Sequence, residues 1–122
     1  MSINVLYLTY DGNKSREIIK MLKIKFINNV SEYTKKIIIR KTGDPSVIPV
    51  SESEYNAVGI CQGDLADILY AADIAEKAAT VKVGEIQGTC PNHIACIGIW
   101  GDTSSVKTAL TEIRKEFPEI KR

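Results

Sequence analysis

The sequence predicts an α/β protein, more specifically an α+β sandwich in which helices pack on a sheet that contains antiparallel strands. Short runs of β-branched and aromatic residues alternate with longer amphipathic stretches, which is typical of interleaved strands and helices. From Tyr55 onward the predicted order is strand, helix, strand, strand, helix, so both helices can cover one face of the sheet. A chain of 122 residues, 44% of them hydrophobic, can bury a core without disulfides or metals.

Composition and charge argue against several classes of protein. The formal net charge is +1, and the lysines are spread out apart from a concentration between Lys20 and Lys41, so nucleic acid is not expected as a main partner. The N-terminus shows no secretory pattern, and no apolar run approaches the ~20 residues that cross a bilayer. We therefore expect a cytoplasmic protein without a membrane partner. Three cysteines, an odd number, do not indicate a disulfide framework.

The first half is predicted to hold two strands, one helix and a linker. A strand over Ile3–Tyr10 stops at the turn signal Asp11-Gly12, and Ser15 can cap a helix that runs to about Asn28. The apolar stripe of that helix would be Ile18, Ile19, Leu22 and Phe26. Thr34–Lys41, with three consecutive isoleucines, predicts a second strand, and Gly43–Ser53, with two prolines, predicts a linker.

The second half has a sharper pattern. Tyr55–Cys61 predicts a strand, and Asp64 can cap the helix that follows. The predicted core face of this helix is Leu65, Ile68, Leu69, Ala72 and Ala79. Thr80–Gln87 and Ile94–Trp100 predict a hairpin, with Trp100 as a packing residue. A last helix, capped by Asp102 or Thr103 and ended by Pro118, has the predicted core face Val106, Ala109, Leu110, Ile113 and Phe117.

The loop between the two hairpin strands is the candidate functional site. It reads Gly88, Thr89, Cys90, Pro91, Asn92, His93, and it holds the only histidine of the chain and the one cysteine outside an apolar run. Cys61 and Cys96 lie in apolar strands and are expected in the core. From the residues alone, Cys90 can also be a free thiol that binds nothing.

Other chemistries for this loop are less well supported by the sequence. Cys90 and His93 can form a thiolate–imidazole pair of a small cysteine enzyme, but no orienting carboxylate or substrate pocket is evident. A zinc site that adds Cys96 lacks the usual Cys-x2-Cys spacing. His93 is otherwise a turn residue, an auxiliary ligand or a proton donor. The helix predicted to begin at Asp64 carries several carboxylates, but none of them has a facing base for acid–base catalysis: Asp64, Asp67, Asp73 and Glu76.

The second half resembles the shell domain of bacterial microcompartments (the BMC domain). Ala71–Val81 is similar to the helix-to-strand signature of that domain, Gly101–Leu110 to the start of its second helix, and Ala57–Ile60 to its opening strand. The first half differs, because 54 residues precede Tyr55 and the chain ends soon after Phe117. This resembles the circularly permuted subclass, in which the N-terminus supplies the final strand and helix.

The resemblance implies one BMC domain over residues 1–122, with a permuted N-terminal segment (1–54) and a β-α-β-β-α core (55–117). Either Ile37–Arg40 or Ile3–Tyr10 would then fill the place of the final strand. The resemblance also implies a structural protein rather than an enzyme. It would be a homo-hexamer that assembles with other shell proteins into a microcompartment shell in the cytoplasm, with Lys77 at the edge where hexamers abut.

The same resemblance gives the loop a role, because the corresponding loop of the family lines the pore of the hexamer. A Gly-x-Cys-Pro segment there is similar to the iron–sulfur-binding shell proteins of glycyl-radical-enzyme microcompartments, the GrpU type. This implies an iron–sulfur cluster, expected as [4Fe–4S], for electron transfer or cluster transport across the shell. Such a cluster needs about four ligands, so Cys90 would have to come from several subunits. A cluster-free pore for small polar metabolites is the alternative.

Overall fold

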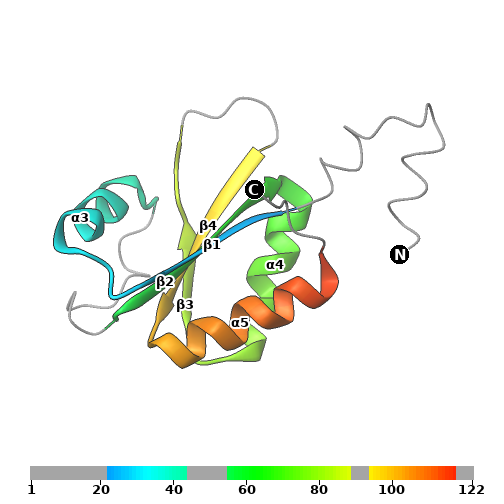
Figure 1. The fold of residues 1–122 in the computed structure, drawn as a ribbon. Coiled ribbons are helices and arrows are strands. Elements are labelled where there is room, and N and C mark those ends of the chain that lie inside the picture. The colour runs from blue at the N-terminus through cyan, green and yellow to red at the C-terminus, as the bar shows by residue number, and fades with distance from the viewer. Residues whose placement is uncertain (1–21, 44–54, 89–93, 118–122) are drawn as a thin grey trace.

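A four-stranded antiparallel sheet organises the part of the chain that the structure describes. The structure is a computed structural model, and it describes residues 22–43, 55–88 and 94–117 (Figure 1). The elements in chain order are β1 (Lys23–Asn28), α3 (Glu32–Lys41), β2 (Ala57–Asp64), α4 (Leu65–Ala78), β3 (Lys82–Glu85), β4 (Ile94–Gly101) and α5 (Thr103–Glu116). The predicted strand over residues 3–10, most of the predicted linker and Pro118 lie outside the described residues.

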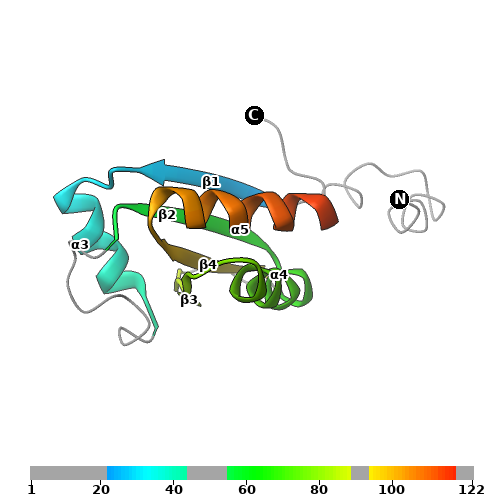
Figure 2. The same ribbon diagram turned by 90° about the horizontal axis from the view of Figure 1, so that it is seen from below.

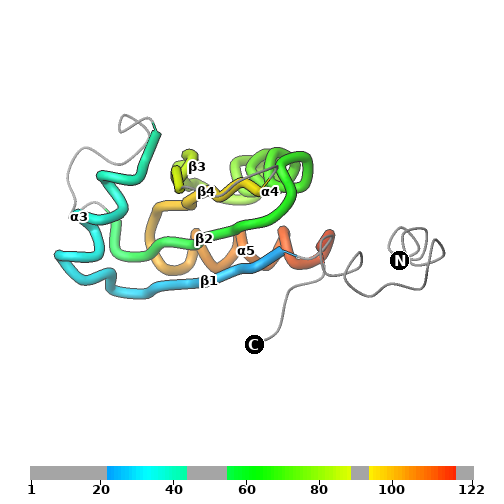
Figure 3. Tube along the Cα trace, turned by 90° about the horizontal axis from the view of Figure 1, so that it is seen from above, coloured from blue at the N-terminus to red at the C-terminus, as the bar shows by residue number. Residues whose placement is uncertain are grey.

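The strand order in the sheet is β1-β2-β4-β3, so β1 and β3 form its two edges (Figure 3). β2 and β4 pair along their whole length, from Ala57 opposite Gly101 to Asp64 opposite Ile94. Helices α4 and α5 pack against each other and cover one face of the sheet, with α5 reaching β1 and α4 reaching β3 (Figure 2). Helix α3 lies on the other side of the sheet (Figure 1). The predicted α+β class is therefore confirmed.

Each face of the sheet buries its own apolar cluster. The larger cluster lies under α4 and α5 and includes Ile24, Cys61, Ile99 and Leu110. The smaller cluster lies under α3 and consists of Val30, Ile38, Tyr55, Val58 and Trp100. Trp100 is fully buried there, as predicted. Because both faces of β2 and β4 are covered, these two strands are apolar on nearly every residue.

Both helix starts predicted for the second half are confirmed. The Asp64 carboxylate accepts a hydrogen bond from the Ala66 amide at 3.2 Å, and the Asp102 carboxylate accepts one from the Ser105 amide at 2.8 Å. These bonds satisfy amides that have no partner in the first turn of a helix. The predicted core face of α5 is confirmed in full: Val106, Ala109, Leu110, Ile113 and Phe117 are buried.

The predicted core face of α4 is wrong at two of its leucines. The buried side chains are Ile68, Ala71 and Ala75, whereas Leu65 is 48% and Leu69 63% exposed. The alanines have almost no side chain to hold the helix away from the sheet, so α4 packs on them. Because the alanine side of α4 faces the sheet, the larger Leu65 and Leu69 lie at the side of the helix.

Two predictions for the first half are also wrong. Residues 23–28, expected as the end of a helix, form β1 and pair with β2, because Ile24 and Phe26 alternate with exposed lysines and fit a half-buried edge strand. Residues 34–41, expected as a strand, belong to helix α3, which buries Lys35 and Ile38 at helical spacing. The β preference of the isoleucine run is overridden by this packing.

The place expected for the final strand of the permuted domain is therefore filled by β1. It lies beside β2, and helix α3 follows it directly in the chain. The segment Ile37–Arg40 does not fill this place, since it is helical, and residues 3–10 lie outside the described residues. A strand followed by a helix thus precedes the β-α-β-β-α order, which is the arrangement that circular permutation requires.

Candidate functional site

The candidate loop is carried on the β3–β4 hairpin. β3 pairs antiparallel with β4 from Lys82 opposite Trp100 to Glu85 opposite Ile97, and the Ile86 amide extends this pairing by donating to the Cys96 carbonyl at 2.9 Å. Gly88 lies at the end of this stem and is exposed. The other predicted loop residues, Thr89, Cys90, Pro91, Asn92 and His93, lie outside the described residues.

The end of α3 holds the outer edge of the hairpin at the base of the loop. Thr42 forms an antiparallel bridge to Ile86, the Gln87 amide donates to the Lys41 carbonyl at 2.6 Å, and the Gly43 amide donates to the Glu85 carbonyl at 3.1 Å. The Thr42 hydroxyl also donates to the Ile38 carbonyl at 2.6 Å, which ties this short edge to α3. The polar backbone of β3 is therefore paired on both sides just before the loop.

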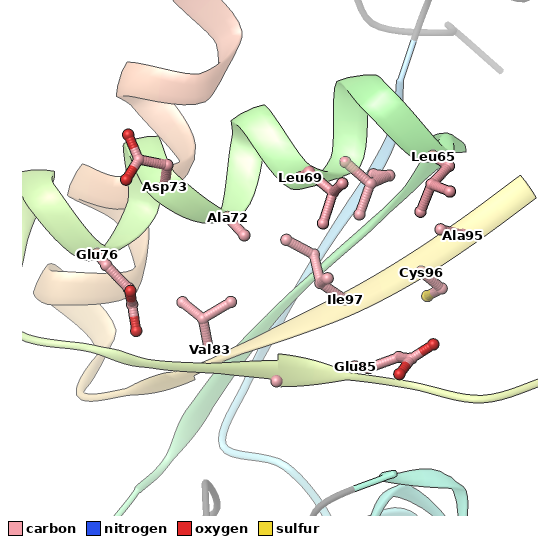
Figure 4. Close-up of a pocket in the computed structure, with 12 residues that line it drawn as sticks. Leu65, Leu69, Ala72, Asp73, Glu76, Val83, Glu85, Ala95, Cys96 and Ile97 are labelled. Atoms are coloured by element: carbon pink, nitrogen blue, oxygen red, sulfur yellow. The ribbon is translucent and has the colours of Figure 1, made fainter.

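A mostly apolar groove of about 530 Å³ lies between α4 and the hairpin (Figure 4). Leu65, Leu69 and Ala72 project from α4 toward the strands, and Ala95 and Ile97 of β4 lie opposite them. The carboxylates of Asp73, Glu76 and Glu85 lie along the groove. Since Leu65, Leu69 and the nearby Ile94 are all exposed, this side of the molecule presents apolar surface to whatever adjoins it.

The two cysteines outside the loop differ in their surroundings. Cys61 is fully buried in the larger core cluster, as predicted. Cys96 is only partly buried and borders the groove, so the prediction that it belongs to the core is wrong. The alternation of side chains along β4 could have predicted the partial exposure of Cys96. Ile97 and Ile99 face the larger core cluster, so the side chain of Cys96 points to the opposite face of the sheet.

A metal cluster would need more thiolates than one chain brings together here. Within residues 22–43, 55–88 and 94–117, no group of three or more histidine, cysteine or acidic side chains could hold a metal ion. An iron–sulfur cluster is held by about four thiolates. The donor set fits such a cluster only where loops from several copies of the chain meet.

Lys77 lies near the end of α4 and is largely exposed. Its ammonium group is 2.8 Å from the Asp73 carboxylate, and its side chain is 75% exposed. The hydrogen bond to Asp73, and then the charge of Asp73, raise the pKa of Lys77 above its ordinary value of 10.5. Lys77 therefore stays a cation in solution at neutral pH, available to a neighbouring molecule.

Comparison with known proteins places these features in a family. A family model for the BMC domain matches residues 57–122, and no curated protein matches the chain. The chain resembles the ligand-free structure of the GrpU microcompartment shell protein from Clostridiales bacterium 1_7_47FAA. The sequence identity is 32%, the TM-score is 0.56, and the match covers 77% of this chain and 89% of that one.

Two further structures share the fold. One is the ligand-free GrpU microcompartment shell protein from Pectobacterium wasabiae, with 24% identity, a TM-score of 0.59 and coverage of 75% of this chain and 99% of that one. The other is a fused permuted hexameric shell protein from the RMM microcompartment, with 18% identity and a TM-score of 0.61. Its match covers 79% of this chain and 45% of that one.

The family accounts for several features of the chain at once. Its members are structural proteins that assemble into hexamers with other shell proteins. Among the helices that the structure describes, none is long and apolar enough to cross a membrane. Strand β1, which precedes the matched region and is followed by α3, completes the sheet of that region, as in a permuted domain. The chain therefore belongs to the BMC domain family and is a structural, non-enzymatic shell protein of a bacterial microcompartment, similar to GrpU.

Proposed function

We propose that this chain forms a homo-hexamer whose pore is lined by the loop 88–93. In this proposal Cys90 from several subunits holds an iron–sulfur cluster, which carries electrons across the shell or is itself the cargo. The whole chain acts as one domain, with residues 1–54 as its permuted part and 55–117 as its core.

The observation that carries the proposal is the firm anchoring of the strand ends on either side of the loop. Only five residues separate Gly88 from Ile94, and both ends are fixed by the hairpin and by the edge formed by residues 41–43. Because the two ends of the loop are fixed on the stem, symmetry would repeat the loop at equivalent positions around the axis of a ring. Gly88, without a side chain, leaves room for backbone to approach a bulky cluster.

The chemistry also requires the oligomer. Cys61 is sealed in the core, and Cys96 is partly buried within β4, outside the loop, so Cys90 is the thiol that we propose for a shared site. A bound cluster would supply one-electron redox chemistry at the pore. The residues of this chain would supply the ligand sulfur, hold it on the stem and leave the rest of the loop to shape access.

The groove supports the oligomer part of the proposal. A ring is closed by a heterologous contact, in which one surface of a subunit meets a different surface of the next. Exposed apolar surface of the kind formed by Leu65, Leu69 and Ile94 typically marks a protein interface. We therefore place the neighbouring subunit of the ring against this groove.

The oligomer is tested by replacing one groove leucine. Leu69→Glu introduces a charge into the apolar surface and is expected to give particles smaller than a hexamer in size-exclusion chromatography with light scattering. Tyr33→Glu is the matched control, since Tyr33 is also an exposed apolar side chain, at 67%, but lies on α3 away from the groove. A Leu69→Glu protein that remains hexameric would show that the ring contact lies elsewhere.

The cluster is tested by anaerobic reconstitution with iron and sulfide. The wild-type hexamer is expected to gain bound iron and visible charge-transfer absorption, and Cys90→Ser is expected to lose both while remaining a hexamer. Cys96→Ser is the control, because it removes a partly accessible thiol outside the loop and should load normally. A colourless wild-type hexamer would leave a shell protein with a pore for small polar metabolites.

A further inference from the structure

The two sides of the sheet carry different charge. We define the α3 face as the surface on the α3 side of the sheet. Among the described residues, six exposed basic side chains lie on it: Lys23, Lys25, Lys36, Arg40, Lys41 and Lys82. The acidic side chains described on this face are Glu32 and Asp64, and the Asp64 carboxylate is engaged at the start of α4.

The assignment of the strand lysines to this face follows from the register of the sheet. Ile24 and Phe26 pack into the cluster under α4 and α5, so the alternating Lys23 and Lys25 point to the α3 side. Lys82 is paired with Trp100, which belongs to the cluster under α3. The lysines of both sheet edges therefore add to the charge of the helix.

The opposite side of the sheet is acidic by comparison. Its described carboxylates are Asp67, Asp73, Glu76, Glu85, Asp102, Glu112 and Glu116, against the bases Lys77, Lys107, Arg114 and Lys115. Two of those bases are already paired, Lys77 with Asp73 and Lys115 with Glu112. The near-zero net charge of the whole chain thus conceals an uneven distribution of charged side chains, with an excess of positive charge on the α3 face.

The α3 face also adjoins the base of the candidate loop. The Lys41 carbonyl accepts from the Gln87 amide, so the basic end of α3 is bonded to the hairpin directly before the loop. Repeated around a ring, Lys36, Arg40 and Lys41 of each copy would form a positive collar near the pore. Such an array attracts anionic partners and raises their rate of encounter.

We infer that the α3 face is the docking surface for a small acidic electron-carrier protein. The acidic character of the partner follows from the charge of the face, and its role as an electron carrier rests on the proposed function. Electron-transfer encounters are small, transient interfaces that depend on charge steering more than on buried apolar area. A face with six exposed cations and one exposed aromatic, Tyr33, fits that kind of contact.

Nucleic acid suits the face less well. Phosphate binding needs a broad basic field, whereas the opposite side of this molecule is acidic and the chain as a whole carries a formal charge of +1. In a hexamer the same acidic surfaces would be repeated six-fold and would repel a long polyanion. A compact acidic protein can contact the α3 face alone.

The test uses a purified flavodoxin, a small acidic flavin protein, as the probe. Its affinity for the wild-type hexamer is measured by isothermal titration calorimetry at low salt and near physiological salt. We expect about ten-fold weaker binding at the higher salt, because exposed charges are screened there. The α3 variant Lys36→Gln/Arg40→Gln/Lys41→Gln should weaken binding at low salt by about ten-fold or more.

The matched control changes the same charges on the other side of the sheet. Lys107→Gln/Arg114→Gln/Lys115→Gln on α5 removes an equal net charge and is expected to change the affinity by less than about two-fold. Circular dichroism and light scattering establish that both variants are folded hexamers. Equal losses in the two variants, or no binding by wild type at low salt, would overturn the inference. Tighter binding of a single-stranded oligonucleotide, lost in the α3 variant, would replace the protein partner by nucleic acid.

A Cys90→Ser protein separates this inference from the proposed function. It lacks the loop thiol but keeps the α3 face, so it should bind flavodoxin as wild type does. If wild type binds flavodoxin but does not load a cluster, the proposed iron–sulfur site is wrong and the docking surface still holds. Cluster loading without docking would overturn the docking surface alone.

Discussion

Substitution of Gly98 by alanine tests whether the smaller apolar cluster, which lies under α3, is as tightly packed as the structure indicates. Gly98 lies in the middle of β4, against the indole ring of Trp100. A β-carbon at position 98 would lie 2.6 and 2.7 Å from two ring carbons of Trp100 and 3.0 Å from the Ile86 side chain. Real β-carbons do not approach other atoms this closely, and the ring is fully buried, so it must shift as a rigid unit.

Two opposing effects set the size of the change. Alanine restricts the unfolded chain more than glycine does, which stabilises by about 0.4–1 kcal/mol. Overpacking a well-filled core costs about 1–3 kcal/mol, and a rigid aromatic ring places this site near the upper value. The steric effect therefore dominates, and we expect a net loss of about 2 kcal/mol, which for a chain of this size lowers Tm by roughly 5–10 °C.

The assay is urea unfolding followed by tryptophan fluorescence at a fixed protein concentration. Trp100 is the only tryptophan in the chain, so the signal reports directly on the displaced ring. Gly43→Ala is the control, because the nearest atom to its β-carbon is the end of the flexible Gln87 side chain, and it should stay within about 0.5 kcal/mol of wild type. A Gly98→Ala protein with unchanged stability and emission would refute the packing of Trp100 on Gly98.

Three further predictions address other parts of the molecule. Leu22→Ala should destabilise by about 2–5 kcal/mol in denaturant unfolding, since Leu22 is fully buried beside β1, whereas exposed Lys23→Ala should be nearly neutral; equal effects would contradict the position of β1. The hydrogen bond from the Ser105 amide, followed by that from the Ser104 hydroxyl, lowers the pKa of Asp102 below its usual 3.8. This stabilisation is present above the unfolded pKa and is lost as pH falls through the folded one, so the Tm difference between wild type and Asp102→Ala should shrink below about pH 4; a difference independent of pH would argue against the charged cap. Lys77→Ala should leave hexamers intact in light scattering but prevent their lateral assembly in electron micrographs, with exposed Lys107→Ala as the control; unchanged sheets would remove Lys77 from the hexamer edge.

Local sequence determined most of the second half. Asp64 and Asp102 each precede a helical pattern and cap it, because a carboxylate at that position satisfies amides of the first turn whatever the rest of the fold is. The apolar spacing of α5 predicted its buried face residue by residue. The position of the candidate loop also followed from local chemistry, since the turn-forming residues Gly88 and Pro91 lie between the two apolar segments that contain β3 and β4.

Tertiary contacts decided the first half. The segment 34–41 has strong β preference, yet it is a helix, because the packing of Ile38 against the sheet and the 3.4 Å hydrogen bond from the buried Lys35 ammonium group to the Tyr55 carbonyl override a context-dependent β propensity. Residues 23–28 carry lysines that suit a helix, yet they pair with β2, since the exposed edge of that strand offers unsatisfied backbone groups. The local sequence of these two segments does not show that the sheet will cover the first and that β2 will pair with the second.

The surfaces that carry the proposed functions depend on the fold in the same way. The groove exists because α4 packs on alanines and leaves its leucines exposed beside the hairpin. The α3 face exists because lysines far apart in the chain share one side of the sheet. Sequence alone determined the family, the core elements after Tyr55 and the loop that bears Cys90. Only the tertiary structure decided which surfaces adjoin that loop, because packing and strand pairing, not local preference, fix which side each residue faces.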